Sequence, residues 1–188
     1  MIFSRLFRPD PNLAPAHALY EALVAQARQP GFYRDWEVPD TLDGRFELVT
    51  LHTFLLLHRL KVERAASADL AQALFDILFA DMDQSLRELG VGDLGVGPRI
   101  KTMAEAFYGR IAAYQEVLEG PGGNPEAALA RNLYGTMSAS PASLAAMAGY
   151  LRAAALLLAE QQLDALAAGR AVFPRVPAPG AASEGVAP

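Results

Sequence analysis

The chain has 188 residues, no cysteine and a formal net charge of -5. Without cysteine it has no disulfides, thiolate nucleophiles, zinc-thiolate sites or iron–sulfur clusters. An acidic balance argues against a general nucleic-acid binder, which needs a surplus of Lys and Arg. Because 52% of the residues are hydrophobic and Ala and Leu outnumber Val and Ile, we expect one all-α domain with a single core.

The N-terminal part predicts one helix followed by an ordered loop. A helix over 13–29 has Asn12 as its expected cap and ends at Pro30–Gly31. The next segment, 31–45, mixes aromatic residues with proline and glycine and has neither helical nor alternating periodicity. We therefore expect a loop there.

Two further helices are predicted before residue 90. From about Thr41 or Asp43 to Arg64 the chain is apolar nearly all round, which predicts a central helix enclosed by other helices. Ser67 is the expected cap of a third helix. That helix ends at Leu89, where Gly90 occupies the position of a left-handed C-terminal glycine.

Three more helices complete a predicted single-domain bundle of about six. Pro98 is the expected start of the fourth, Pro125 starts a short fifth, and Ser140–Pro141 opens a long sixth that runs to about residue 168. The last residues are rich in Pro, Gly and Ala, which predicts disorder. The expected organisation is an N-terminal arm (1–11), a helical domain (12–173) and a disordered tail (174–188).

Gly90, Gly92 and Gly95 have the G-x-G-x-x-G spacing of a dinucleotide-binding turn. That turn requires a β-strand before it, and here a predicted helix precedes Gly90. We expect a connection between two helices instead, in which Asp93 bonds turn amides and Gly97–Pro98 starts the next helix.

The fourth predicted helix carries small residues along one flank, namely Thr102, Ala106, Gly109 and Ala113, with Arg99 and Arg110 at its edges. A glycine in mid-helix costs up to about 1 kcal/mol relative to alanine, so another backbone is expected to approach it closely. The favoured interpretation is that one of the protein's own helices fills this groove; an external segment is the alternative.

Charged residues raise two further alternatives. Arg99 and Lys101 fall in the first turn of this predicted helix, where the dipole disfavours cations, so a partner or a solvated turn with a Lys101–Glu105 pair would explain them.

Two stripes with seven-residue spacing are also present: Arg45, His52 and Arg59 on the central helix, and Asp69, Asp76 and Asp83 on the next. Three interpretations of the stripes are open: the two stripes pair with each other, one of them faces a client, or they form two separate solvated faces. The last interpretation is slightly favoured.

The sequence contains no pattern that favours catalysis or a metal site. Of its histidines, His52 and His58 are six residues apart and do not share a helical face, and no nucleophile has an activating signature. We assign no catalytic residue, metal or cofactor.

The given sequence also shows no pattern typical of a targeting signal. The N-terminal segment lacks the apolar region of a secretory signal, and the longest apolar tract, Leu144–Ala159, contains Arg152 and falls short of a membrane span. We expect a cytoplasmic protein. The segment MIFSRLFR either packs on the body, the favoured interpretation, or touches an anionic membrane surface.

Three blocks together resemble the ubiquinol-cytochrome c chaperone family, the bacterial relatives of the mitochondrial complex III assembly factor. They are WEVPDTLDGRFELVTLHTFLLLHRL at 36–60, FADMDQSLRELGVGDLGVGPRIKTMAEAFYGR at 79–110, and ALARNLYG at 128–135. The order V-P-D-T-x-x-G-R-F, L-R-E-x-G-V-G-D and F-Y-G-R is not a generic helical pattern. The resemblance covers roughly residues 15–135.

The resemblance implies a non-enzymatic assembly factor that binds newly made cytochrome b, or another complex III subunit, with a small co-chaperone and peripheral contact with the inner membrane as further expectations. A helical protein that binds lipid, quinone or haem is the alternative function. The candidates for client binding are Arg45, His52, Arg59, Arg99, Lys101, Thr102, Ala106, Tyr108, Gly109 and Arg110. Trp36, Gly90 and Asp93 are motif positions, and for Trp36, Asp93 and Tyr108 core packing or turn capping is favoured.

Overall fold

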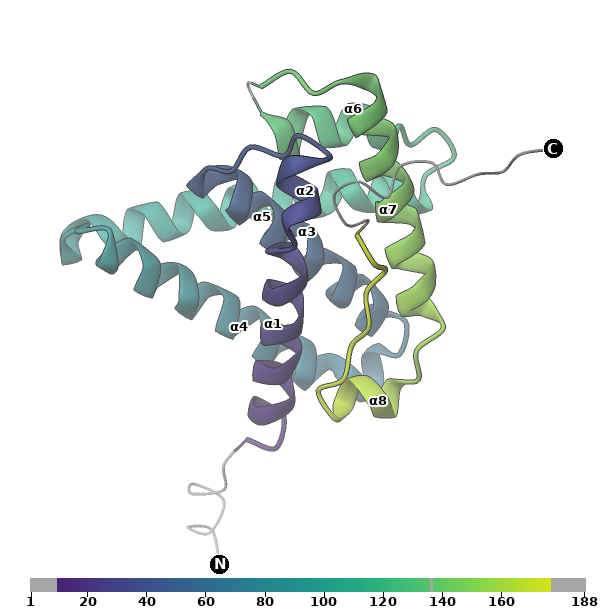
Figure 1. Cartoon of the computed structure of the whole chain (residues 1–188). Coiled ribbons are helices and arrows are strands. Elements are labelled where there is room, and N and C mark those ends of the chain that lie inside the picture. Colours follow the sequence, from purple (N-terminus) through teal and green to yellow (C-terminus); the bar gives the residue numbers. More distant parts are fainter. Residues whose placement is uncertain (1–9, 136, 177–188) are drawn as a thin grey trace, which may run out of the picture.

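The computed structural model describes residues 10–135 and 137–176, and in these residues the chain is helical with no β-strand (Figure 1). The expected all-α bundle is confirmed. The helices are α1 (Leu13–Ala27), α2 (Pro30–Arg34), α3 (Leu42–Lys61), α4 (Arg64–Glu88), α5 (Asp93–Glu119), α6 (Pro125–Leu129), the π-helical turn η2 (Ala130–Tyr134), α7 (Pro141–Ala159) and α8 (Leu163–Ala167).

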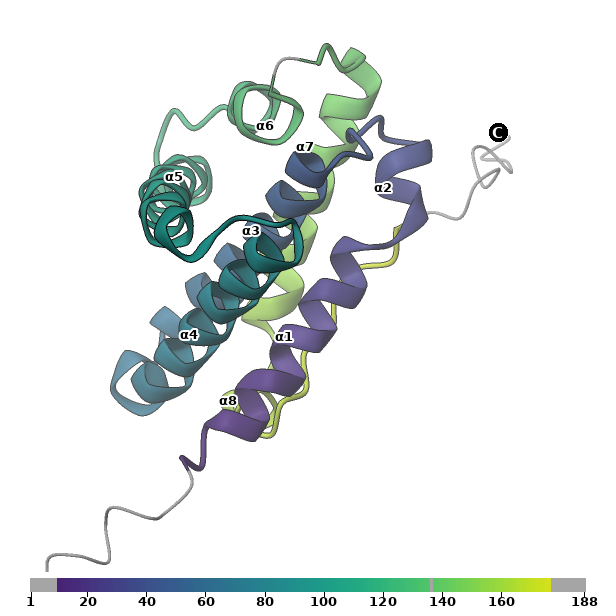
Figure 2. The same ribbon diagram turned by 90° about the vertical axis from the view of Figure 1, so that its left-hand side faces the viewer.

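Helix α3 is the centre of the bundle. It contacts α1, α4, α5, α7 and η2, and Figure 2 shows α1 and α5 on opposite sides of it. Its buried residues face every direction around the helix axis, from Leu48 and Leu51 to Phe54 and Leu60. The prediction of a central helix enclosed by others is confirmed.

Several predicted boundaries are wrong for local reasons. Helix α2 lies inside the predicted loop because Pro30 supplies its first helical position. Helix α4 starts at Arg64, and the Ser67 hydroxyl donates to the carbonyl oxygen of Leu60 at 2.6 Å instead of capping an N-terminus. The long sixth helix is divided into α7 and α8 by a break at residues 160–162.

The ends of the chain differ from the expected organisation at one boundary. Phe173 and Val176 pack against the core, and the carbonyl oxygen of Pro174 accepts a 2.9 Å hydrogen bond from Gln26. The predicted disordered tail therefore cannot begin at 174. The predictions for residues 1–9 and 177–188 lie outside the described residues.

Helix α7 extends beyond the apolar tract at 144–159, since it starts at Pro141. By length and composition alone it could cross a membrane, with a mean hydropathy of 1.6 over its most apolar window, which corrects the expectation from the sequence. In the bundle, Met147, Leu151 and Leu158 are buried in the core. The same apolar pattern is therefore used here to pack against α3 and α6.

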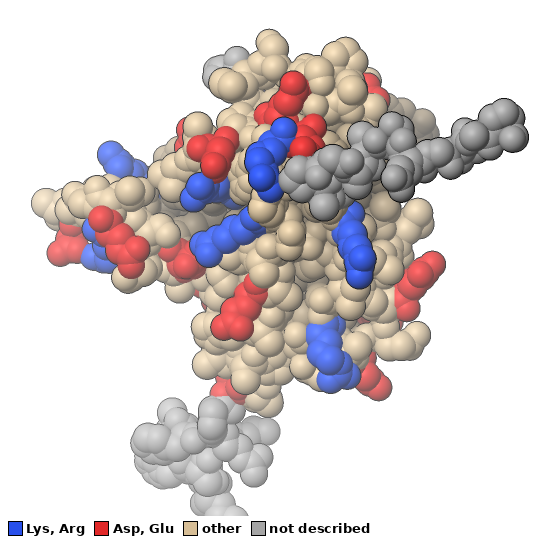
Figure 3. Space-filling view, viewed as in Figure 1, with Lys and Arg blue, Asp and Glu red and all other residues tan. Residues whose placement is uncertain are grey.

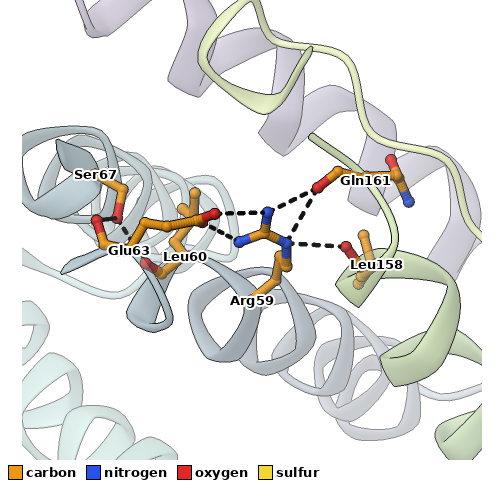
Figure 4. Close-up of polar contacts among 6 residues, drawn as sticks. All are labelled: Arg59, Leu60, Glu63, Ser67, Leu158 and Gln161. Atoms are coloured by element: carbon orange, nitrogen blue, oxygen red, sulfur yellow. Dashed lines mark hydrogen bonds and ion pairs between the residues drawn. The ribbon is translucent and has the colours of Figure 1, made fainter. Parts of the chain in front are cut away.

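Arg59 of α3 is a buried cation, only 6% exposed, that caps the end of α7 (Figure 4). Its Nε donates to the carbonyl oxygen of Leu158 at 3.0 Å, and its Nη2 donates to that of Gln161 at 2.7 Å. It also pairs with Glu63. The last carbonyls of a helix lack partners within the helix and carry the negative end of its dipole, so a cation there fixes where α7 stops.

His52 of α3 is fully buried at the start of a directed chain of hydrogen bonds. Its Nδ1 lies 2.7 Å from the carbonyl oxygen of Leu48, which can only accept, so Nδ1 carries the proton. Its Nε2 then accepts from the hydroxyl of Tyr150 at 2.7 Å, and that hydroxyl accepts from the Gln26 amide at 3.0 Å. The arrangement requires a neutral imidazole.

We expect Arg59→Met to destabilise the fold by about 2–3 kcal/mol, because it removes the guanidinium donor of the Gln161 carbonyl and one of the donors of the Leu158 carbonyl. The matched variant Glu63→Gln keeps both carbonyl bonds and removes only a half-exposed ion pair, so it should cost under about 1 kcal/mol. Urea unfolding followed by circular dichroism measures both. Equal losses in the two variants would show that the ion pair, and not the capping, stabilises this corner.

The neutral state of His52 predicts a pH dependence. Burial lowers its pKa to about 4, against 6.5 for the free side chain. The unfolded chain therefore takes up this proton first, so the contribution is complete above pH 6.5 and is lost as the pH falls towards 4, by roughly 3 kcal/mol in all. Urea unfolding at pH 7.5 and 5 should show a steeper loss for the wild type than for His52→Gln. Parallel losses would contradict this origin.

Candidate functional site

Several exposed candidate residues lie together on the solvent side of α5. We call this surface the α5 outer face and define it by the exposed residues Lys101, Thr102, Glu105, Tyr108, Gly109 and Ala112. They share one side of the helix because they are spaced three and four residues apart. Ala106 and Ala113 are half-buried at its edge.

Gly109 is the open point of the α5 outer face. A Cβ atom added at Gly109 would meet no other atom within 4 Å. The prediction that one of the protein's own helices fills the small-residue groove is therefore wrong at this position. A mid-helix glycine lowers helix stability by about 1 kcal/mol relative to alanine, and no packing within the described residues requires it.

Tyr108 extends the accessible surface beside Gly109. Its side chain is 58% exposed, so the expectation of core packing is wrong for most of the ring. One side of the ring rests near the rings of Phe75 on α4 and Phe107, with centroids 6.0 and 6.1 Å away. The tyrosine thus presents a large amphipathic surface, and the two phenylalanine rings support it from below. Side chains of this kind anchor contacts between proteins.

Arg110 is not a free edge of this surface. Its guanidinium makes a two-point ion pair with Glu47 of α3, whose side chain is buried. Burial raises the pKa of the Glu47 carboxyl, and the facing Arg110 charge opposes that rise. The pair joins α5 to α3, so we assign Arg110 a structural role in place of client binding.

Arg99 and Lys101 lie deeper in α5 than predicted, because α5 starts at Asp93 and Pro98 is inside it. The argument from the helix dipole therefore fails for both. The expected Lys101–Glu105 pair is present at 3.9 Å, between two exposed side chains. Arg99 is exposed and lines a shallow hollow at the α4–α5 connection, where Leu94 is 97% exposed.

The α4–α5 connection is a helix-to-helix turn, as predicted from the failed dinucleotide pattern. Gly90 has a positive φ of 82°, which confirms its left-handed role. Asp93 is the first residue of α5 and pairs with Arg87, so its predicted bonds to turn amides are wrong.

The expected basic stripe on α3 is wrong. His52 and Arg59 are buried and bonded within the bundle, as described above, and only Arg45 is exposed, where it pairs with Asp40 at 2.7 Å. On the face shown in Figure 3, Lys and Arg are interspersed with Asp and Glu and form no continuous basic field. In this conformation His52 and Arg59 cannot contact a client.

Two motif positions explain the start of α3. The Thr41 hydroxyl accepts from the Gly44 amide at 3.1 Å, which caps the helix. A Cβ on Gly44 would lie 2.0 Å from the Pro39 carbonyl oxygen, so only glycine fits there. The V-P-D-T-x-x-G-R-F motif is therefore a helix-start motif, which sequence inspection alone did not recognise.

Trp36 is half-buried and packs against the core, which agrees with the predicted packing role. Its ring lies edge-on to Phe32 at 5.5 Å and near Tyr150 at 5.8 Å. Its carbonyl oxygen accepts from the hydroxyl of Tyr134 at 2.6 Å.

The alternative function requires a large apolar cavity. In residues 10–135 and 137–176, the two best-defined hollows lie open at the surface. The larger is the one of about 580 Å³ at the α4–α5 connection; the other is bounded by charged side chains such as Arg34 and Asp40. Neither hollow is an enclosed apolar site of the kind that a lipid, quinone or haem would occupy.

The Glu47–Arg110 pair makes a prediction about stability. Arg110→Leu leaves the Glu47 carboxylate buried without its partner and should cost about 2–3 kcal/mol. The double variant Glu47→Leu/Arg110→Leu should recover part of this loss, because no unpaired charge remains. Lys101→Leu, on the exposed side of the same helix, is the control and should change stability by under about 0.5 kcal/mol. Urea unfolding measures all three, and a double variant less stable than Arg110→Leu would contradict the explanation.

Comparisons with known proteins place this arrangement in a family. The family model described as ubiquinol-cytochrome C chaperone matches residues 34–173. The match extends to α7, α8 and Phe173, which corrects the coverage expected from the sequence blocks.

Individual relatives point to the same family. The chain is 26% identical over 134 residues to ubiquinol-cytochrome-c reductase complex assembly factor 1 of Xenopus laevis, covering 71% of this chain and 67% of the relative. It is 24% identical to the Mus musculus assembly factor 1, of which it spans only 45%. The crystal structure of the Cbp3 homolog from Brucella abortus superposes with a TM-score of 0.78 at 41% identity, covering 88% of this chain and 92% of that one. The chain belongs to the ubiquinol-cytochrome c chaperone family.

Proposed function

We propose that this chain is an assembly chaperone that binds newly made cytochrome b and supports assembly of the ubiquinol-cytochrome c reductase complex. The observation that carries the proposal is the family match over residues 34–173, together with relatives named as assembly factors of that complex. The role needs no catalysis. A chaperone of this kind acts by covering an apolar segment of its client until the client's partners arrive, which requires binding energy alone.

The α5 outer face is the proposed client surface. Tyr108 and Gly109 belong to the F-Y-G-R motif, and of its four residues Phe107 and Arg110 are used inside the fold. Tyr108 is mostly exposed, and the space beside Gly109 is open. A segment that lies against Gly109 can approach the α5 backbone closely while its apolar side chains contact the Tyr108 ring.

The proposal includes a location and two further contacts. We propose that the chaperone acts in the cytoplasm, at or near the inner membrane. A small co-chaperone and peripheral contact with the membrane are parts of the proposal that rest on the family resemblance.

Deleting the gene tests the proposed function directly. The expected result is a loss of spectroscopic cytochrome b and of quinol-cytochrome c reductase activity, both restored by the wild-type gene. Normal cytochrome b levels and normal reductase activity in the deletion strain would reject the function.

The client surface is tested with Gly109→Leu, which fills the open space on α5 with a branched side chain. We expect capture of cytochrome b in pull-downs to fall about tenfold or more, because a segment can no longer approach the backbone. The fold should not suffer, since leucine favours helix over glycine by about 1 kcal/mol. The control is Gly149→Leu on α7, also an exposed helical glycine at which an added Cβ would meet no atom within 4 Å. Unchanged capture by Gly109→Leu, or equal loss in both variants, would reject this surface.

A further inference from the structure

The segment after α8 runs as an extended chain along the bundle. We call residues Arg170–Val176 the strap. Gly169, with a φ of 76°, turns the chain beside α1, where a Cβ would lie 2.7 Å from that of Ala18. The strap then passes between α1 and α7, as the yellow segment of Figure 1 shows. It has neither helix nor sheet partner.

The groove holds the strap through its main chain. The Gln161 side chain makes a two-point contact with Val172, donating to its carbonyl oxygen at 2.8 Å and accepting from its amide at 2.9 Å. From the other side, Gln26 donates to the carbonyl oxygen of Pro174 at 2.9 Å. All three bonds involve backbone atoms of the strap, so they do not depend on the side chains that the strap carries.

The strap side chains alternate between the core and solvent. This alternation holds from Ala171 to Phe173: Ala171 and Phe173 pack against the core, while Val172 is 60% exposed. Beyond them Arg175 is exposed and Val176 packs against the core. The Phe173 ring stands edge-on to the buried His52 ring, with centroids 5.3 Å apart. Main-chain bonds, combined with pockets for selected side chains, are how proteins bind extended peptides.

The ring that Phe173 meets is also held by contacts within the bundle. The His52 ring is oriented by Leu48 and Tyr150, and Tyr150 shares the Gln26 amide with Pro174 of the strap. Arg59 fixes the position of Gln161 through its carbonyl oxygen. The groove is therefore built by α1, α3 and the end of α7, and the strap adds the Phe173 ring, the smaller side chains of Ala171 and Val176, and three hydrogen bonds to it.

We propose that the groove between α1 and α7 binds an extended apolar polypeptide segment, and that the strap is its exchangeable occupant in the free protein. The required segment carries a large apolar side chain at the Phe173 position and an exposed side chain at the Val172 position. Such a segment displaces the strap and takes over its main-chain bonds. This groove is separate from the α5 outer face, and the inference does not depend on which protein is the client.

Trans binding of a strap peptide tests the exchange. The probe is a fluorescein-labelled peptide of the sequence RAVFPRV, measured by fluorescence anisotropy with full-length protein. In the wild type the attached strap competes at an effective concentration in the millimolar range, so the peptide binds weakly. In Phe173→Ala the strap loses its anchoring ring, and we expect the peptide to bind about tenfold tighter or more. The control Val172→Ala removes an exposed side chain of the same strap and should behave as the wild type.

Two results of this assay would contradict the proposal. A Phe173→Ala protein that is folded by circular dichroism and binds the peptide no tighter than the wild type would overturn the proposal. So would equal binding of a peptide in which alanine replaces phenylalanine. Because the assay contains no cytochrome b, its outcome is separate from that of the gene deletion.

If Phe173→Ala does not fold, hydrogen exchange on the wild-type protein tests whether the strap is exchangeable. An exchangeable strap opens locally, so the Val172 amide should exchange by a route independent of denaturant and much faster than the amides of α3. Exchange of the Val172 amide at the same rate as Leu55 in α3 would show that the strap leaves only on global unfolding, and would overturn the proposal.

Discussion

Enclosure of α3 is the constraint on which the rest of the structure depends. The charged and imidazole side chains of a helix enclosed by others need partners from those neighbours, since a buried group without a partner costs on the order of 1–3 kcal/mol. Glu47 is paired by α5, His52 by Tyr150 of α7, and Arg59 by the last carbonyls of α7. These contacts fix the positions of the surrounding helices, so the outer face of α5 and the groove beside α7 are both consequences of what α3 buries.

The α5 outer face and the groove between α1 and α7 differ in kind. The α5 outer face is an open helix surface with an exposed tyrosine beside a glycine whose flank is empty. The groove between α1 and α7 is filled by the chain itself and bonds to main-chain atoms. A helix surface suits a helical or compact segment, whereas the groove suits an extended one.

Periodicity in the sequence predicted most of the helices, the central place of α3 and the left-handed Gly90. It could not predict which way His52 and Arg59 point: seven-residue spacing shows that they share a side of α3, but a helix apolar all round has no polar side to mark as the outside. For Gly109 the difficulty was similar, because small residues occur both in tight helix contacts and on open surfaces. The sequence did not predict the strap, because the strap is held through its backbone atoms, which leave no side-chain pattern, and through a single aromatic side chain, Phe173.

Site-specific photo-crosslinking during synthesis of the client tests the central claim most directly. A photoreactive amino acid is placed at Tyr108 on the α5 outer face and, in a separate protein, at Arg131 of η2, which is exposed elsewhere on the bundle. The account predicts crosslinks to newly made cytochrome b from position 108 and none above background from position 131. Equal crosslinking from the two positions, or none from position 108 while the protein still supports complex assembly, would contradict it.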